Sequence, residues 1–317
     1  MTDVLNLSLP LFGLILLGYG AAHILRIEEK GLAWLNALIV YFAVPALIFR
    51  TVARAPFEEL ANLSFIAATT ASTLIIYTAA TVSALLIFKQ RLQTAAIQGS
   101  AASYGNVGYM GLALSVTAFG TPAAVPAALI FCFDSVLQFT LTPLLIAIGV
   151  RHDHENVKFA AVAVRIAKSI LLHPFIIATL AGIAASAARI SLPGAVDNLL
   201  DLLVNAAAPA ALFALGVTLA LRHFAGIGRE FPVIVLLKVI VHPLVAYAVV
   251  STVVGLDPVW LYVAILMASL PTAANVFILA TQYRLYVEGT SSAILVTTIL
   301  TALTVPVLLY LAQHGLL

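Results

Sequence analysis

The chain has 317 residues, of which 63% are hydrophobic and only 9% are charged, and its net charge is +2. Soluble domains carry about 25% charged residues, so this composition indicates a membrane protein and excludes a nucleic-acid-binding function. The first ten residues, MTDVLNLSLP, contain no Lys or Arg. We therefore interpret them as the start of a first membrane span and not as a signal peptide.

Ten apolar segments are each long enough to form a transmembrane helix, which needs about 20 mostly apolar residues. In chain order they cover approximately residues 5–24, 33–51, 64–88, 94–119, 122–148, 160–186, 195–220, 231–254, 258–281 and 290–312. The alternating pattern of a membrane β-strand is absent. Because helices satisfy their own backbone groups in lipid, we predict an all-α polytopic membrane protein.

The second half of the chain repeats the first at a constant offset in residue number. The matching residues include Pro10, Gly18 and Pro45, which recur as Pro174, Gly182 and Pro209. Residues 35–49 also match residues 199–213 at seven of fifteen positions. Residues 1–149 and 159–317 then form two repeats of five spans each. An odd number of spans inserts the copies in opposite orientations, and such inverted repeats are typical of secondary transporters.

Positive charges predict the orientation of these spans. Eleven of the fifteen Lys and Arg residues lie in the connections that follow odd-numbered spans, and three lie in the other connections. Connections rich in Lys and Arg face the cytoplasm. We therefore expect both termini to face outward across the plasma (inner) membrane, and the connection at 150–158 to be cytoplasmic.

Helix-breaking residues occur in the middle of the fourth and ninth spans. One break contains three glycines, and the other contains a proline, which removes a backbone hydrogen bond. Paired breaks in corresponding spans indicate a transport site, and the N-termini of half-helices suit a carboxylate. The candidate substrate-binding residues are Gly105, Asn106, Gly108, Tyr109, Pro271, Thr272 and Asn275. The alternative is a kink in which glycines serve only close helix packing.

Four polar residues inside the spans are candidates for ion coupling or for support of the site, because polar groups in the bilayer are costly. Asp134 and Gln138 share a helix face and could coordinate Na⁺ or carry a proton. Lys238 and His242 have the same spacing. Lys238 either pairs with Asp134 or replaces a coupling ion. The alternative for all four is a structural role.

Other polar residues receive less specific interpretations. Pro45 and Pro209 are predicted to kink the second and seventh spans, and Asn205 lies one turn before the second of these prolines. We assign these three to the scaffold side of the protein. Arg50 and Arg54 are interpreted as interfacial anchors. No hydrolase or nucleotide-binding motif is present, so we expect a protein that is not an enzyme and has no metal site or organic cofactor.

Five segments together resemble the auxin efflux carrier family, including its bacterial, malonate-carrier-like members. These segments are VYFAVPALIF, GNVGYMGLAL, ALFALGVTLAL, LKVIVHPL and LPTAANVFILA, in that order along the chain. The resemblance implies a bile-acid-symporter-like fold in which spans 4 and 9 cross at their breaks beside the substrate. It also implies a dimerising scaffold of spans 1, 2, 6 and 7 and a moving transport domain of spans 3–5 and 8–10.

The chain departs from the family pattern in two places. Ala113 stands where the fourth span of the family usually has a proline, so the break there must depend on glycines. The third span also lacks the acidic residue of the plant carriers. The expected function is elevator-type transport of small organic anions, either auxin-like carboxylates or dicarboxylates, coupled to Na⁺ or H⁺ or uncoupled. The alternatives are a sodium-coupled bile-acid-type symporter and a passive channel.

Overall fold

The structure is a computed structural model that describes residues 2–55, 57–153, 164, 167, 168, 171–190, 192–221 and 228–314. All regular elements in these ranges are helices, apart from one isolated bridge. The first half contains α1 Thr2–Ile24, α2 Glu29–Leu38, η1 Ile39–Ala43, α3 Val44–Arg54, α4 Phe57–Leu60, α5 Leu63–Leu86, α6 Leu92–Ser103, η2 Val107–Gly111, α7 Leu112–Phe119, η3 Thr121–Ala123 and α8 Ala124–Asp153.

The second half is also helical throughout its described part. It contains α10 Pro174–Ala187, α11 Gly194–Leu221, α12 Phe231–Leu236, η4 Leu237–Val241, α13 His242–Val250, α14 Pro258–Ala268, α15 Ala274–Tyr283 and α16 Val287–Gln313. The prediction of an all-α chain is therefore confirmed for the described residues.

Six described helices are long and apolar enough to cross a membrane. They are Lys30–Arg54, Leu63–Leu86, Thr121–Val150, Gly194–Leu221, Phe231–Val250 and Val287–Ala312. The predicted fourth and ninth spans are each divided into two shorter helices. The predicted sixth span is interrupted at His173, where the backbone is extended and after which Pro174 begins α10. The predicted connection begins late, since α8 continues to Asp153, and residues 154–158 lie outside the described part.

Helix packing follows the internal repeat. α1 lies along α11, and α10 lies along α3, so each copy of the first repeated helix contacts the second helix of the other copy. Gly18 on α1 faces the backbone carbonyl of Phe213, and Gly182 on α10 faces that of Phe49. Both glycines and both phenylalanines occupy equivalent positions in the sequence repeat. The two halves therefore contact each other reciprocally through these helices.

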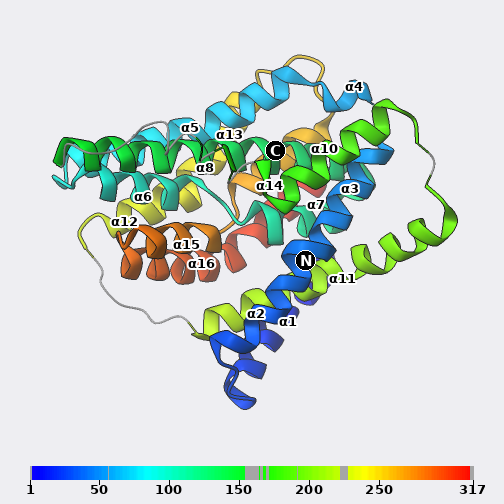
Figure 1. The fold of residues 1–317 in the computed structure, drawn as a ribbon, viewed down its shortest axis with the longest axis horizontal. Coiled ribbons are helices and arrows are strands. Elements are labelled where there is room, and N and C mark those ends of the chain that lie inside the picture. The colour runs from blue at the N-terminus through cyan, green and yellow to red at the C-terminus, as the bar shows by residue number, and fades with distance from the viewer. Residues whose placement is uncertain are drawn as a thin grey trace.

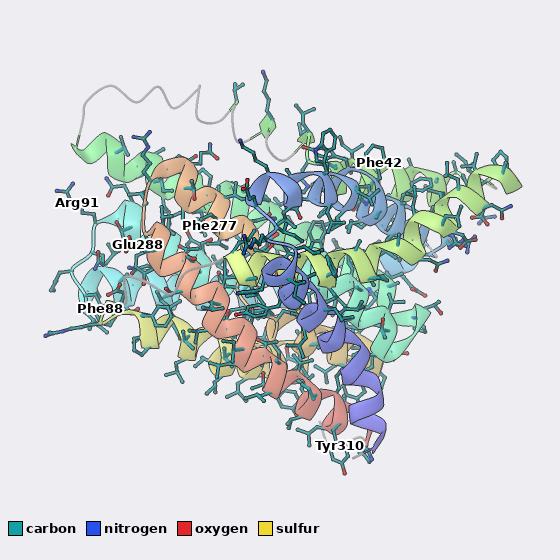
Figure 2. The ribbon with its side chains drawn as sticks, turned by 90° about the horizontal axis from the view of Figure 1, so that it is seen from below. Phe42, Phe88, Arg91, Phe277, Glu288 and Tyr310 are labelled. Atoms are coloured by element: carbon teal, nitrogen blue, oxygen red, sulfur yellow. The ribbon has the colours of Figure 1, made fainter. Side chains whose placement is uncertain are left out.

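The helices form two groups (Figure 1). One group contains α1, α2, α3, α10 and α11, and the other contains α5, α6, α8, α13, α15 and α16. In the side-chain view, Phe42 of η1 lies at the periphery, whereas Phe277 of α15 lies nearer the middle of the molecule (Figure 2). Phe42 is exposed, as a lipid-facing side chain would be, and Phe277 is half-buried.

Two prolines are accommodated by wide turns of π-helix. Pro45 follows η1, and Pro243 follows η4. A proline inside an α-helix clashes with the carbonyl four residues earlier, and a π-turn moves that carbonyl away. At the end of η1 the Val44 amide donates to Ile39, five residues back. α11, by contrast, is assigned as helix through Pro209 without such a turn. The two predicted kinks are therefore not alike.

Candidate functional site

The two helix breaks lie side by side and are joined by backbone hydrogen bonds. The Asn106 amide donates to the Pro271 carbonyl at 2.8 Å, and the Ala273 amide donates to the Tyr104 carbonyl at 3.1 Å. Between these bonds, Gly105 and Thr272 form an antiparallel bridge. Backbone groups freed by the breaks thus satisfy one another inside the molecule, as groups at membrane depth must.

Thr272 fixes this pairing to two further helices. Its hydroxyl donates to the Ala101 carbonyl of α6 at 2.7 Å, and its amide donates to the Thr297 hydroxyl of α16 at 3.0 Å. The side chain is fully buried. Thr272 therefore links the two paired breaks, which we call the crossing, to α6 and α16. It is not among the residues that line the two cavities described next.

The glycines of the first break have different roles from those predicted. Gly108 and Gly111 lie within the helical turn after the break, not in it. A Cβ on Gly108 would lie 2.8 Å from the Phe131 ring, and one on Gly111 would lie against Met267. These two glycines serve close packing, which was the alternative interpretation. Only Gly105 lies in the unwound segment.

A cavity of about 290 Å³ lies beside the paired breaks. Both candidate asparagines, Asn106 and Asn275, line it together with Asn36 of α2 and Thr218 of α11. The rest of its lining is apolar. The cavity is therefore bounded by the breaks on one side and by α2 and α11 on the other. No charged side chain is among its lining residues, so a charged ligand would have to be held by amides and helix dipoles.

Asn106 is the most distinctive of these polar groups. It is only 3% exposed, and it lines the cavity. Buried amide groups are normally paired, so a ligand or water in the cavity is a natural partner for its side chain. The side chain of Asn275 is half-buried and interacts with the Tyr104 hydroxyl. The two asparagines are thus unequal in their surroundings.

A larger cavity of about 630 Å³ adjoins the first. The two share Ala33, Asn36, Asn275 and Ile278. The larger cavity continues past Lys168, His173 and Gln282. His173 directly precedes α10, so the two cavities together extend from the breaks to the N-terminal end of α10.

Asp134 and Gln138 lie on α8, away from the lining of both cavities. Gln138 donates to the Ser100 hydroxyl of α6. Asp134 is 3% exposed, and one of its carboxylate oxygens has no hydrogen-bond partner among the described residues. It faces Thr73 and interacts electrostatically with Lys238. A buried carboxylate oxygen without a donor is costly unless the group is protonated or binds a cation.

Lys238 lies at the ends of both interrupted helices. Its Nζ donates to the Ser103 carbonyl at 3.4 Å and to the Ala268 carbonyl at 3.0 Å. These residues are the last of α6 and α14. Nζ also lies 3.1 Å from Nδ1 of His242, and no part of Lys238 is exposed. The predicted direct pair with Asp134 is not formed, because the ammonium is held by these three acceptors instead.

Arg50 and Arg54 form ion pairs with acidic residues of α11. Arg50 forms ion pairs with Asp197 and Asp201 of α11, and Arg54 donates to Asp197 at 2.7 and 2.8 Å. The Arg50 side chain is only 17% exposed. Both arginines line a separate cavity of about 470 Å³ that also contacts Trp260 of α14. The interpretation as interfacial anchors did not include these carboxylate partners on α11.

Several other predicted residues lie outside the cavity linings. Gly105, Gly108 and Pro271 are buried, and Pro45 is half-buried on α3. Asn205 and Pro209 are exposed on α11. The side chain of Tyr109 lies outside the described residues. Asn36 and Thr218 were not predicted, although an asparagine within the apolar segment LNALIV was a usable signal.

Comparison with known proteins identifies the family. A family model described as "Membrane transport protein" matches residues 3–309. A "Putative malonate transporter" of Rhizobium meliloti (strain 1021) is 43% identical over 317 residues, covering 100% of this chain and 98% of the relative. An "Uncharacterized transporter" of Methanothermobacter thermautotrophicus is 27% identical and covers 92% of this chain and 93% of its own length.

A third relative, "Uncharacterized transporter YfdV" of Escherichia coli (strain K12), is 24% identical, and the match covers 96% of each chain. These relatives are named as transporters, in agreement with the expectation that the protein is not an enzyme. The resemblance to auxin efflux carriers is likewise confirmed at the level of the family. Since the family match spans nearly the whole sequence, this chain belongs to the membrane transport protein family.

Proposed function

We propose that the protein carries small organic dianions, of which malonate is the first candidate, across the plasma (inner) membrane. The observation that carries this proposal is the cavity lined by Asn106 and Asn275 beside two half-helix N-termini. The first amides of a helix have no intrahelical partner, and the N-terminus carries a partial positive charge. Amide donors and helix N-termini together suit a carboxylate.

The size of the cavity supports a small substrate. Pockets for drug-sized ligands have volumes of roughly 300 Å³ or more. The cavity volume of about 290 Å³ is therefore at the lower limit of that range. This size favours a dicarboxylate over a steroid, which the bile-acid-type alternative would require. The 43% identity to a relative named for malonate transport supports the same substrate class.

We propose ten spans in two inverted repeats of five, at 1–149 and 159–317, with both termini outside. The reciprocal packing of α1 on α11 and of α10 on α3 supports this arrangement. α1–α3, α10 and α11 would form the scaffold and the contact of a homodimer. The remaining helices would form a transport domain that moves as an elevator. The cavity supports this division, because it lies between the breaks on one side and α2 and α11 on the other.

We propose that Asp134 couples transport to H⁺. Its buried, partnerless carboxylate oxygen supports this role, and Lys238 and Tyr104 are the ionisable side chains of neighbouring helices that interact with it. In liposomes, Asp134→Asn should remove the dependence of malonate uptake on a pH gradient. Uptake by this variant with an unchanged dependence on that gradient would make Asp134 structural.

The binding experiment uses purified protein and a thermal-shift assay with malonate, succinate, acetate and an indole carboxylate. Malonate should raise the Tm of the wild type, and Asn106→Ala should abolish most of that shift without lowering the ligand-free Tm by much. Losing a hydrogen bond to a charged group costs about 1.5–3 kcal/mol, or roughly 10- to 150-fold in affinity. Asn205→Ala, an exposed asparagine on α11, is the matched control and should leave the shift unchanged.

Two outcomes would refute the site. One is an unchanged malonate shift in both Asn106→Ala and Asn275→Ala. The other is a loss of the shift that is equally large in Asn205→Ala. A passive channel is tested separately by counterflow. External malonate should accelerate the exchange of labelled internal malonate by a carrier, whereas a channel would give no such acceleration.

A further inference from the structure

The ends of the interrupted helices carry a charge that must be balanced. α6 ends at Ser103 and α14 ends at Ala268, and both ends meet at the crossing. A helix C-terminus is equivalent to about −0.5 charge, so two such ends amount to about −1. A dry interior cannot leave this charge uncompensated, because buried polar groups without partners are costly. A single monovalent cation is the smallest group that would balance it.

The side chain of Lys238 supplies this charge. Its Nζ lies 3.4 Å from the Ser103 carbonyl oxygen, 3.0 Å from the Ala268 carbonyl oxygen and 3.1 Å from Nδ1 of His242. An ammonium has three N–H donors and no acceptor, and here it meets three acceptors. His242 is itself buried, and its Nδ1 accepts when Nε2 carries the ring proton.

Gly105 leaves the space that the ammonium needs. A Cβ at this position would lie 3.2 Å from Nζ of Lys238 and 3.1 Å from the Met267 carbonyl oxygen. Gly105 does not have a positive φ, so backbone conformation does not explain the glycine. The absence of a side chain at the break instead allows Lys238 to reach both helix ends.

We propose that the Lys238 ammonium is the cation that balances the helix ends at the crossing and occupies the position that a bound Na⁺ would otherwise need. Folding and substrate binding are then independent of Na⁺. The substrate part of this inference depends on the proposed function, but the folding part does not. Lys238 is thus a positioning residue. It joins the C-terminal ends of α6 and α14, while the substrate meets the N-terminal ends that follow the breaks.

The first test replaces Na⁺ with N-methyl-D-glucamine at constant ionic strength. The Tm of the ligand-free wild type, and the malonate shift, should be the same in both salts. A wild-type Tm that rises with Na⁺, or a malonate affinity that rises several-fold or more, would overturn the proposal.

The second test uses chemical rescue of Lys238→Ala. This variant should have a lower Tm than the wild type, and ethylammonium or Na⁺ should restore part of the loss, whereas tetramethylammonium is too large to do so. Lys238→Met fills the same space without charge, so added cations should not restore its Tm. Lys30→Ala, which removes an exposed lysine of α2, is the matched control and should leave the Tm nearly unchanged.

Two results in this series would contradict the role of Lys238. One is a Lys238→Met protein as stable as the wild type, and the other is an equal rescue of Lys238→Ala and Lys238→Met by the same cations. If Lys238→Ala does not fold, Gly105→Ala provides a second variant, because its Cβ should displace Nζ and lower the Tm. These Tm measurements need no substrate. If malonate fails to shift the wild type, the proposed substrate fails while the role of Lys238 is still tested.

Discussion

Gly18 and Gly20 lie on the same helix and offer a matched test of the α1–α11 contact. Gly18 is buried, and a Cβ there would collide with the Phe213 carbonyl, a backbone group that cannot rotate away. A Cβ on Gly20 would have no heavy atom within 4 Å. Replacing a helical glycine by alanine contributes about 1 kcal/mol of stability through helix propensity alone. Overpacking costs about 1–3 kcal/mol.

The two substitutions should therefore change stability in opposite directions. Gly20→Ala should raise the free energy of unfolding by up to about 1 kcal/mol. Gly18→Ala should lower it by up to about 2 kcal/mol, because the clash with a fixed backbone oxygen exceeds the gain in propensity. Gly182→Ala, the equivalent change in the second repeat, should have a smaller effect, since its closest contact, Val52 Cβ at 2.8 Å, is farther away than the Phe213 oxygen is from a Cβ on Gly18.

Thermal-shift assays on the purified proteins would measure this order. One kcal/mol corresponds to about 2–4 °C in chains of about 150–250 residues, so Gly18→Ala and Gly20→Ala should differ by several degrees. Equal Tm values for these two variants would refute the close packing of α1 on α11. They would also remove the main support for reciprocal packing of the two repeats.

Two further predictions concern the crossing and the arginine cluster. Thr272→Val should lower the free energy of unfolding by about 1 kcal/mol, the usual net contribution of one hydrogen bond. The bond lost is the one to Ala101, and Thr272→Ser should retain most of it, so equal Tm values for the two variants would show that the hydroxyl is not used. Arg50→Gln and Asp201→Asn should show a coupling energy of up to about 1 kcal/mol in a double-mutant cycle measured by denaturation. The coupling is small because Asp201 is partly exposed, and strictly additive effects would count against that ion pair.

Hydrophobic patterning located most of the helices, because apolar length and helix-breaking residues act locally. The fourth and ninth spans are broken as Gly105 and Pro271 predicted, and the two breaks meet as a duplicated carrier requires. The roles of individual glycines were less predictable. A glycine that allows close packing, such as Gly108 against Phe131, cannot be distinguished in the sequence from a glycine that breaks a helix.

The sequence does not predict which residues interact when they lie far apart along the chain. Arg50 at the end of a span resembles an interfacial anchor until α11 brings Asp197 and Asp201 next to it. Lys238 resembles a partner for Asp134, yet it is held by backbone carbonyls, which no side-chain pattern can reveal. Asn36 lines the cavity only because α2 packs beside α11 and faces the breaks. Such residues depend on tertiary contacts.

The four helix ends at the crossing divide into two chemically opposite pairs. The C-terminal ends at Ser103 and Ala268 are covered by the ammonium of Lys238. The N-terminal ends, at Asn106 and Ala274, line the cavity. If Lys238 neutralises the negative ends as proposed, the positive ends that face the ligand space should give the cavity a positive potential, although no cation lines it. A carrier of cations would need the reverse arrangement, with carbonyl ends facing the cavity. The polarity of the backbone therefore supports an anion as the substrate.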